Sequence, residues 1–186
     1  MKLDLGCGYN ARHGYEGVDL FAKVQHQVNL FSFPWPWEDS SVDALRSSHF
    51  LEHISTTWIT PDGREVLSPT SPDDRDLLCK FMDECWRILK PGGEFSIIVP
   101  SARSNRAFQD PTHRRFFVAE SFNYFNKDWR NSIGIGHYLC SCDFDVAVNP
   151  IVPNELLTQP SHVQEVRYKH EWNTTLDWNV RLTCRK

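Results

Sequence analysis

Two glycines separated by a single residue follow the first apolar run of the chain, in Leu3-Asp4-Leu5-Gly6-Cys7-Gly8. A backbone without a Cβ can approach a ligand closely, so we expect a flat or anionic group at this turn. The run continues as Gly6-Cys7-Gly8-Tyr9-Asn10-Ala11, which also fits the G-x-G-x-x-A pattern of nicotinamide-binding turns. A tight turn without any ligand is the third interpretation, and the motif alone does not choose among the three.

An acidic residue closes the next apolar run, Gly17-Val18-Asp19-Leu20. A carboxylate at the end of a strand can accept hydrogen bonds from both ribose hydroxyls of a bound nucleoside. Aspartate is also a common turn residue at this kind of position. The glycine turn and Asp19 together are therefore consistent with a nucleoside site.

Histidines and carboxylates form a second group, made up of His49, Glu52 and His53 with Asp110 and His113 further along the chain. Either side-chain type can take the proton of a hydroxyl nucleophile. If residues 49–53 were helical, His49, Glu52 and His53 would lie together, and His113 would complete four metal ligands. Local hydrogen bonding without a metal is the simpler interpretation, and we predict no bound metal.

Four arginines surround the second group, and their forked donors suit a phosphate or carboxylate on a substrate, although a solvated basic surface fits equally well. They are Arg103, Arg106, Arg114 and Arg115.

Short β-like runs that alternate with loops and helices predict an α/β fold that positions these residues. Glu94–Val99 is continuously apolar in its second half, which suits a parallel strand covered on both faces. The predicted strands are Lys2–Leu5, Gly17–Leu20, Gln25–Leu30, Val42–Ser47 and Glu94–Val99, followed by Phe144–Val148 and Asn179–Arg185, which we expect to pair antiparallel at the sheet edge.

One long helix is predicted to start at Ser71-Pro72-Asp73-Asp74, which has a Ser cap, a Pro at the first helical position and a carboxylate three residues after the cap. Apolar residues then recur at helical spacing as far as Leu89, and Lys90-Pro91-Gly92-Gly93 ends the helix. A short helix is expected over Ala119–Asn126. Residues 57–70 and 150–161 are expected to be surface loops near the site.

The chain of 186 residues predicts a single domain over residues 1–186. Its net charge of −4 disfavours nucleic acid as a partner, and no apolar run is long enough for a membrane span. The six cysteines form no CxxC pair and are expected to be reduced, while the N-terminus has no signal-peptide pattern, so a cytoplasmic location is expected.

Four segments, in this order, resemble class I S-adenosylmethionine-dependent methyltransferases: LDLGCG, GVDL, PWPWEDSSVDALRSSHFLEH and WRILKPGGEFSIIVP. Nicotinamide dehydrogenases do not have this series of segments. More narrowly, the runs LGCG, GYxxVDL, SSHFLEH, LKPGG and DPTH are similar to those of a compact methyltransferase-like family, over roughly Leu3 to Phe117. The resemblance implies a Rossmann-like, mostly parallel sheet of about seven strands with an antiparallel edge strand.

The resemblance also implies a role for each matching position. Asp4, Gly6, Cys7 and Gly8 would surround the methionine part of S-adenosyl-L-methionine, Asp19 and Leu20 its ribose, and Asn29 and Leu30 its adenine. Ser48 would adjoin the cofactor at the methyl-transfer pocket, with His49 and His113 as the catalytic candidates. The implied reaction is methylation, at oxygen, of a small-molecule or carbohydrate-like acceptor.

Two departures from the family pattern affect this interpretation. Asn10 stands where a third glycine is often found, although Asn tolerates left-handed φ. Only Tyr9–Glu16 separates the first two strands, so the first crossover helix must be shortened or missing. The site would then be open, and another segment or a second copy of the chain could close it. A catalytically silent, methyltransferase-like binding protein is the alternative function.

Overall fold

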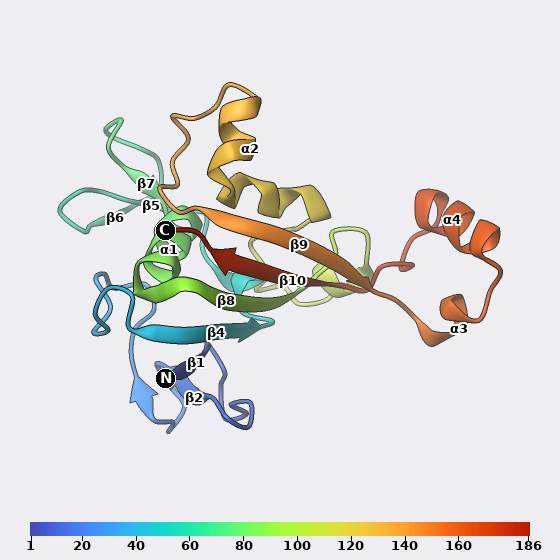
Figure 1. The fold of residues 1–186 in the computed structure, drawn as a ribbon, viewed down its shortest axis with the longest axis horizontal. Coiled ribbons are helices and arrows are strands. Elements are labelled where there is room, and N and C mark those ends of the chain that lie inside the picture. The colour runs from blue at the N-terminus through green and yellow to red at the C-terminus, as the bar shows by residue number, and fades with distance from the viewer.

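A seven-stranded sheet in the order β3-β2-β1-β4-β8-β10-β9 is the centre of the fold (Figure 1), and the computed structural model describes residues 1–186. Strand β10 is antiparallel to both of its neighbours, and the other pairings are parallel. The α/β fold with a mostly parallel sheet and an antiparallel pair at one edge is confirmed. The strands are β1 Lys2–Leu5, β2 Glu16–Asp19, β3 His26–Gln27, β4 Val42–Ser48, β8 Leu89–Pro100, β9 Phe144–Ile151 and β10 Asp177–Cys184.

The first three strands are joined without helices. Strand β1 has the predicted bounds, and residues 6–15 between β1 and β2 contain no helix, which confirms the missing first crossover helix. Strand β3 is shorter than predicted because Asn29 turns the chain, its Oδ1 accepting from Phe31 N at 3.0 Å. The loops after β1 and β2 therefore connect the strands directly, without an intervening helix.

Helix α1 spans Leu77–Ile88, so the predicted start at Ser71 is wrong. The Asp74 carboxylate turns back to accept from the N–H groups of Thr70 and Ser71, and Arg75–Asp76 forms strand β7, which pairs with Trp58–Ile59 (β5). Asp76 is the real N-cap and accepts from Leu78 N at 2.9 Å.

The two segments predicted to be loops contain regular structure, which corrects that expectation. Residues 57–70 form a small hairpin of β5 and β6 (Glu65–Val66), because β7 supplies a third strand to pair with. Residues 150–161 include the end of β9, helix α3 (Asn154–Leu157) and the first residue of α4 (Ser161–His170). Helices α3 and α4 project beyond the sheet at the end of β9 (Figure 1).

The remaining elements are short helices after the strands. The predicted helix at residue 119 exists as a 3-10 helix. These elements are η1 Leu51–His53, η2 Asn105–Ala107, η3 Ala119–Phe125 and α2 Lys127–Ser132. None of the helices has both the length and the apolar character that a membrane span requires.

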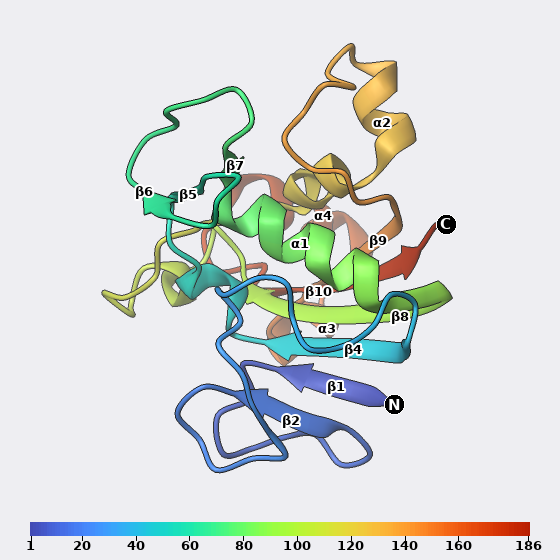
Figure 2. The same cartoon turned by 90° about the vertical axis from the view of Figure 1, so that its left-hand side faces the viewer.

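The sheet is covered on one face only. Helix α1 runs alongside β4 and β8 (Figure 2), and its Phe81, Met82 and Cys85 are fully buried in the same core as Phe95 and Ile97 of β8. No helix lies in front of β4, β8, β10 and β9 in the view of Figure 1. The expectation that Glu94–Val99 is covered on both faces is wrong, because the helices that would cover its second face are missing.

Candidate functional site

Gly6 begins the candidate cofactor loop directly after β1. Its φ is +65°, and an added Cβ would lie 2.2 Å from the ring of Phe50, so glycine is required on both grounds. Its N–H donates to Val18 O at 2.8 Å, which holds the loop against β2. The close approach that the sequence predicts is therefore made, in this structure, by the Phe50 ring.

Asp19 at the end of β2 binds three backbone N–H groups. Its Oδ1 accepts from Phe21 and Ala22 at 2.8 and 3.0 Å, and its Oδ2 accepts from Gly8 at 3.0 Å. Burial alone would raise the pKa of Asp19, but these hydrogen bonds outweigh it and hold the pKa below its usual value. The charged carboxylate thus joins the glycine loop to the end of β2.

A small cavity of about 100 Å³ lies at the carboxyl ends of β1 and β2. Five of the predicted cofactor residues line it, and four further residues, mostly aromatic or aliphatic, complete the wall. The predicted ones are Gly6, Asp19, Leu20, Asn29 and Leu30, and the others are Phe21, Val28, Phe31 and Phe50.

These lining residues fit an adenosyl group chemically, because they combine a glycine turn, a carboxylate acceptor and apolar walls. The volume is small, since sites for drug-sized ligands usually have roughly 300–1,000 Å³. Phe31 and Phe50 stack across the cavity with their centroids 5.9 Å apart. Phe31 is also partly exposed, so the shift of one or both rings would widen the site.

Four other residues predicted to bind the cofactor do not line this cavity. Asp4 is fully buried, and its carboxylate accepts from Arg46 Nη1 at 2.8 Å and from Arg12 N at 2.8 Å, so it anchors the loop from below. The thiol of Cys7 donates to Gly8 O, and the N–H of Gly8 is bound to Asp19. Ser48 ends β4 outside the cavity wall.

His49 follows β4 in a conformation that is rare for a side chain of its size. Its φ is +53°, and its N–H donates to Ile98 O at 2.8 Å. Positive φ at a non-glycine residue frequently marks a functional position. His49 directly precedes Phe50, which lines the cavity, but His49 itself is not among the lining residues.

Glu52 lies three residues later, in η1, and is buried. Its Oε1 is 3.2 Å from His49 Nδ1, and this interaction, with burial opposing it, raises the pKa of His49. The 3-10 turn begins only at Leu51, so His49 and His53 do not lie on one helix as the metal hypothesis required.

His53 and His113 meet through tertiary structure. Their ring centroids are 4.7 Å apart at 77°, and the N–H groups of Arg114 and Arg115 donate to Glu52 O at 2.7 and 3.0 Å. One donor atom each of Glu52, His53 and His113 lies within 4.8 Å of the others. The structure therefore brings together three of the four residues of the predicted cluster and leaves His49 beside them.

Three of the four arginines support the loops around this cluster. Arg103 donates to the carbonyls of Tyr168 and Lys169, Arg106 pairs with Asp177, and Arg115 binds Asp76 at 3.0 Å. The Arg114 guanidinium donates only to backbone carbonyls of its own loop, those of Pro111 and His113. A fork of four free guanidinium groups for a substrate anion is therefore not formed.

An exposed stack of aromatic rings lies beside the cluster and was not predicted. The ring of Phe108 stacks on Phe116 at 4.7 Å and on Trp172 at 6.1 Å, and each of the three is about half exposed. Phe108 directly follows Ala107, whose carbonyl is bound to His113 Nδ1 at 2.9 Å. Trp172 comes from the excursion between β9 and β10, so no local motif could have indicated this arrangement.

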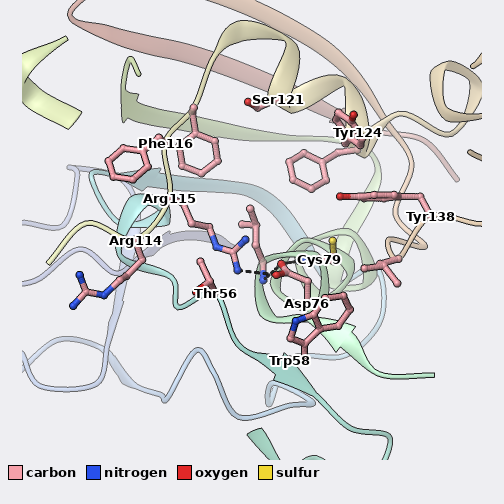
Figure 3. A pocket seen from close by; sticks show the side chains of 14 residues that line it. Thr56, Trp58, Asp76, Cys79, Arg114, Arg115, Phe116, Ser121, Tyr124 and Tyr138 are labelled. Carbon is pink, nitrogen blue, oxygen red and sulfur yellow. Dashed lines mark hydrogen bonds and ion pairs between the residues drawn. The ribbon is translucent and has the colours of Figure 1, made fainter. Parts of the chain in front are cut away.

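A larger cavity of about 510 Å³ is lined in part by the Arg115 side chain (Figure 3). Arg115 and Asp76 form an ion pair in its wall, and Trp58, Tyr124 and Tyr138 also line it. Of the residues singled out in the sequence, only Arg114 and Arg115 line it, and none of the predicted cofactor or catalytic residues does. Its walls come from five separate segments, so no local motif could indicate it.

Comparisons with known proteins identify the fold. No protein-family model matches the chain. No curated protein matches it either. A SAM-dependent methyltransferase from Archaeoglobus fulgidus superposes with a TM-score of 0.60 at 17% identity, covering 98% of this chain and 85% of that one.

Two further solved structures agree. An S-adenosylmethionine-dependent methyltransferase from Mesorhizobium loti has a TM-score of 0.53 at 15% identity, covering 98% of this chain and 89% of that one. A SAM-dependent methyltransferase from Methanosarcina mazei has a TM-score of 0.52 at 13% identity, covering 99% and 92%. The chain has the Rossmann-like fold of these methyltransferases over nearly its whole length.

Proposed function

We propose that this chain is an S-adenosyl-L-methionine-dependent methyltransferase that methylates a hydroxyl oxygen of a small-molecule or carbohydrate-like acceptor. The observation that carries the proposal is the cavity at the ends of β1 and β2, where Gly6, Asp19, Leu20, Asn29 and Leu30 converge from separate loops. Ligand sites of open α/β sheets lie at the carboxyl ends of the strands. The methyltransferase fold supports the same assignment.

The cofactor would supply a methyl group made electrophilic by its sulfonium. Gly6 lets the backbone approach the methionine part, and Leu30 gives the adenine an apolar wall. Asp19 has about four acceptor positions, and three are taken by backbone N–H groups, so one position remains for a ribose hydroxyl.

His49 is the proposed general base. Its imidazole is half exposed, and the next residue, Phe50, lines the cavity, so His49 would accept the hydroxyl proton of the acceptor as the acceptor oxygen takes the methyl group from the cofactor's sulfonium. S-adenosylhomocysteine would be the second product. His113, the other catalytic candidate, donates its Nδ1 proton to Ala107 O, which leaves the lone pair of Nε2 available in the site.

The aromatic stack of Phe108, Phe116 and Trp172 supports an acceptor with a flat or ring-shaped apolar face. Asn105 accepts from Trp172 Nε1 at 2.6 Å, which fixes the indole in place. The net charge of −4 argues against a polyanionic acceptor. A neutral ring compound with hydroxyl groups, such as a sugar, fits these features.

Calorimetric titration with S-adenosylmethionine and S-adenosylhomocysteine tests the cofactor site. We expect saturable binding by the unmodified chain and by Asp145→Ala, whose side chain is 68% exposed on β9. Binding should be lost in Asp19→Ala. No binding at millimolar cofactor would contradict the proposal.

Release of S-adenosylhomocysteine across a panel of hydroxylated acceptors tests the reaction. Activity should fall at least a hundredfold in His49→Ala, while cofactor affinity stays unchanged.

A catalytically silent binding protein is the second candidate function, because the cavity is small and Phe31 and Phe50 stack across it. Cofactor binding without turnover on any acceptor would favour this alternative. Turnover that depends on His49 would exclude it.

A further inference from the structure

We propose that Glu52, His53 and His113 bind one divalent transition-metal ion of the Zn²⁺ type. The three residues lie at the carboxyl ends of β4 and β8, with one donor atom each within 4.8 Å of the others. The cofactor cavity shares none of them.

The Glu52 carboxylate is buried without hydrogen bonds. The side chain is 1% exposed, and it is the only buried carboxylate whose two oxygens both lack a hydrogen-bond partner. His49 Nδ1 is 3.2 Å from Oε1 but is not aligned for a hydrogen bond. His49 is thus the one opposite charge beside Glu52, and it is half exposed; a buried carboxylate without hydrogen bonds is costly, and a metal ion would compensate its charge.

His113 presents a free lone pair at Nε2. Its Nδ1 is 2.9 Å from Ala107 O, and since a carbonyl only accepts, Nδ1 must carry the proton. The neutral ring then has its unprotonated nitrogen at Nε2, which is the metal-binding form. Metal-ligating histidines commonly donate their other N–H to a backbone carbonyl in this way.

His53 has the same tautomer, with its proton on Nδ1, because of its contact with Thr112. The Thr112 hydroxyl is 2.7 Å from Asp110 Oδ1, a carboxylate oxygen that can only accept, so Thr112 donates its single proton there. The 3.0 Å contact between Thr112 Oγ1 and His53 Nδ1 must then be donated by the histidine. Nε2 of His53 is therefore also free to bind a metal.

The loops that carry the ligands are fixed to each other. The Glu52 carbonyl accepts from both Arg114 N and Arg115 N, directly after His113. Around a tetrahedral Zn²⁺ with bonds of about 2.0–2.1 Å, ligand atoms lie roughly 3.3 Å apart. The observed spread of up to 4.8 Å is wider than this, so the three side chains would have to rotate toward the ion to bind it together.

Two imidazoles and a carboxylate are the ligand set of Zn²⁺ and similar first-row ions, and three protein ligands leave a fourth position open. Water would occupy it in the resting protein. Only the next step rests on the proposed function: a hydroxyl oxygen of the methyl acceptor would take this position beside His49.

Titration of chelator-treated protein with Zn²⁺ tests the site, followed by Co²⁺ substitution read by visible absorption. We expect one site per chain in the unmodified protein and in His137→Ala, a control histidine that is exposed and lies outside the cluster. Affinity should fall more than tenfold in Glu52→Gln and His113→Ala. Circular dichroism of each variant checks that it folds, and Glu52→Gln keeps the size of the side chain.

Absence of a saturable site in the unmodified chain would overturn the proposal. So would an affinity that Glu52→Gln and His113→Ala both retain. Metal binding is measured without cofactor, so a chain that binds Zn²⁺ but not S-adenosylmethionine supports this site and refutes the proposed function. Cofactor binding and turnover that persist in a chain with no metal site refute this proposal alone.

Discussion

Two adjacent rows of side chains cross the sheet on opposite faces and differ completely in character. Leu3, Leu45, Phe95 and Leu182 pair side by side and are all fully buried. The next row, on the opposite face, contains Asp4, Arg46, Ser96 and Arg181. Each is one residue later in its strand, except that Arg181 is one residue earlier because β10 is antiparallel. The first row packs under α1, and the second has no helix above it.

The comparison shows how the chain retains a methyltransferase fold without the helices that would follow its first strands. The second face is polar, so it does not need the cover that an apolar face would require. The loops on that side are held by carboxylates instead, with Asp4 binding the N–H of Arg12 and Asp19 the N–H of Gly8. Moving such a loop breaks a few hydrogen bonds, whereas moving a packed helix would also expose apolar surface.

The largest expected effect on stability distinguishes the two faces of the sheet by substitutions at two neighbouring residues of β8. Phe95→Ala removes a fully buried ring under α1 and should lower the free energy of unfolding by about 3–5 kcal/mol. Ser96→Ala, on the opposite face, should change it by less than about 0.5 kcal/mol. Urea unfolding followed by circular dichroism measures both, and similar losses would mean that the second face is covered in solution.

A second prediction tests the one buried ion pair of the polar row. Arg46→Met keeps most of the apolar stem but leaves the Asp4 carboxylate, which is fully buried, with only the N–H of Arg12. We expect a loss of about 3 kcal/mol in the free energy of unfolding.

Arg181→Met in the same row is the matched control. That side chain is 63% exposed and 3.9 Å from Glu94, so the expected change is below about 0.5 kcal/mol. Equal losses in the two variants would show that Asp4 does not depend on its partner.

A third prediction concerns the start of α1, the only long helix on the covered face. Asp76→Ala removes the N-cap and the ion pair with Arg115, and should cost about 1–2 kcal/mol. Asp73→Ala, three residues earlier and exposed, should have little effect. Thermal unfolding measures both variants, and equal losses would mean that Asp76 does not act as the cap of α1.

Helix α1 also shows where sequence reasoning stops. The Ser71-Pro72-Asp73-Asp74 run has every local feature of a helix start, but pairing of Arg75–Asp76 with Trp58–Ile59 delays the helix to Leu77. Strand β1 was predicted with its correct bounds because its apolar run and the glycine that ends it are adjacent in sequence. Local signals were reliable wherever no distant segment competed for the same backbone.

The same distinction applies to the two candidate sites. The cofactor cavity could be expected because Gly6, Asp19 and Leu30 each follow a strand or a short turn in the first thirty residues. The meeting of His53 and His113 depends on hydrogen bonds between loops sixty residues apart, and the protonation of their rings depends on Thr112 and Ala107. Spacing alone suggested those residues as metal ligands but placed His49 among them.

The smallest expected effect is a pH dependence on the side of the sheet where loops replace helices. Hydrogen bonds from three N–H groups hold the pKa of Asp19 below its unfolded value of about 3.9. Since the folded pKa is the lower one, the carboxylate stabilises the fold above pH 4, and this contribution is lost as the pH falls through the folded pKa. Asp19→Asn should therefore be less stable than the unmodified chain at pH 7, and the difference should shrink below pH 4. Urea unfolding at both pH values, with Asp145→Asn as the exposed control, measures it. A difference that stays constant with pH would mean that the pKa of Asp19 is the same in the folded and the unfolded chain, so that its charge does not stabilise the loop.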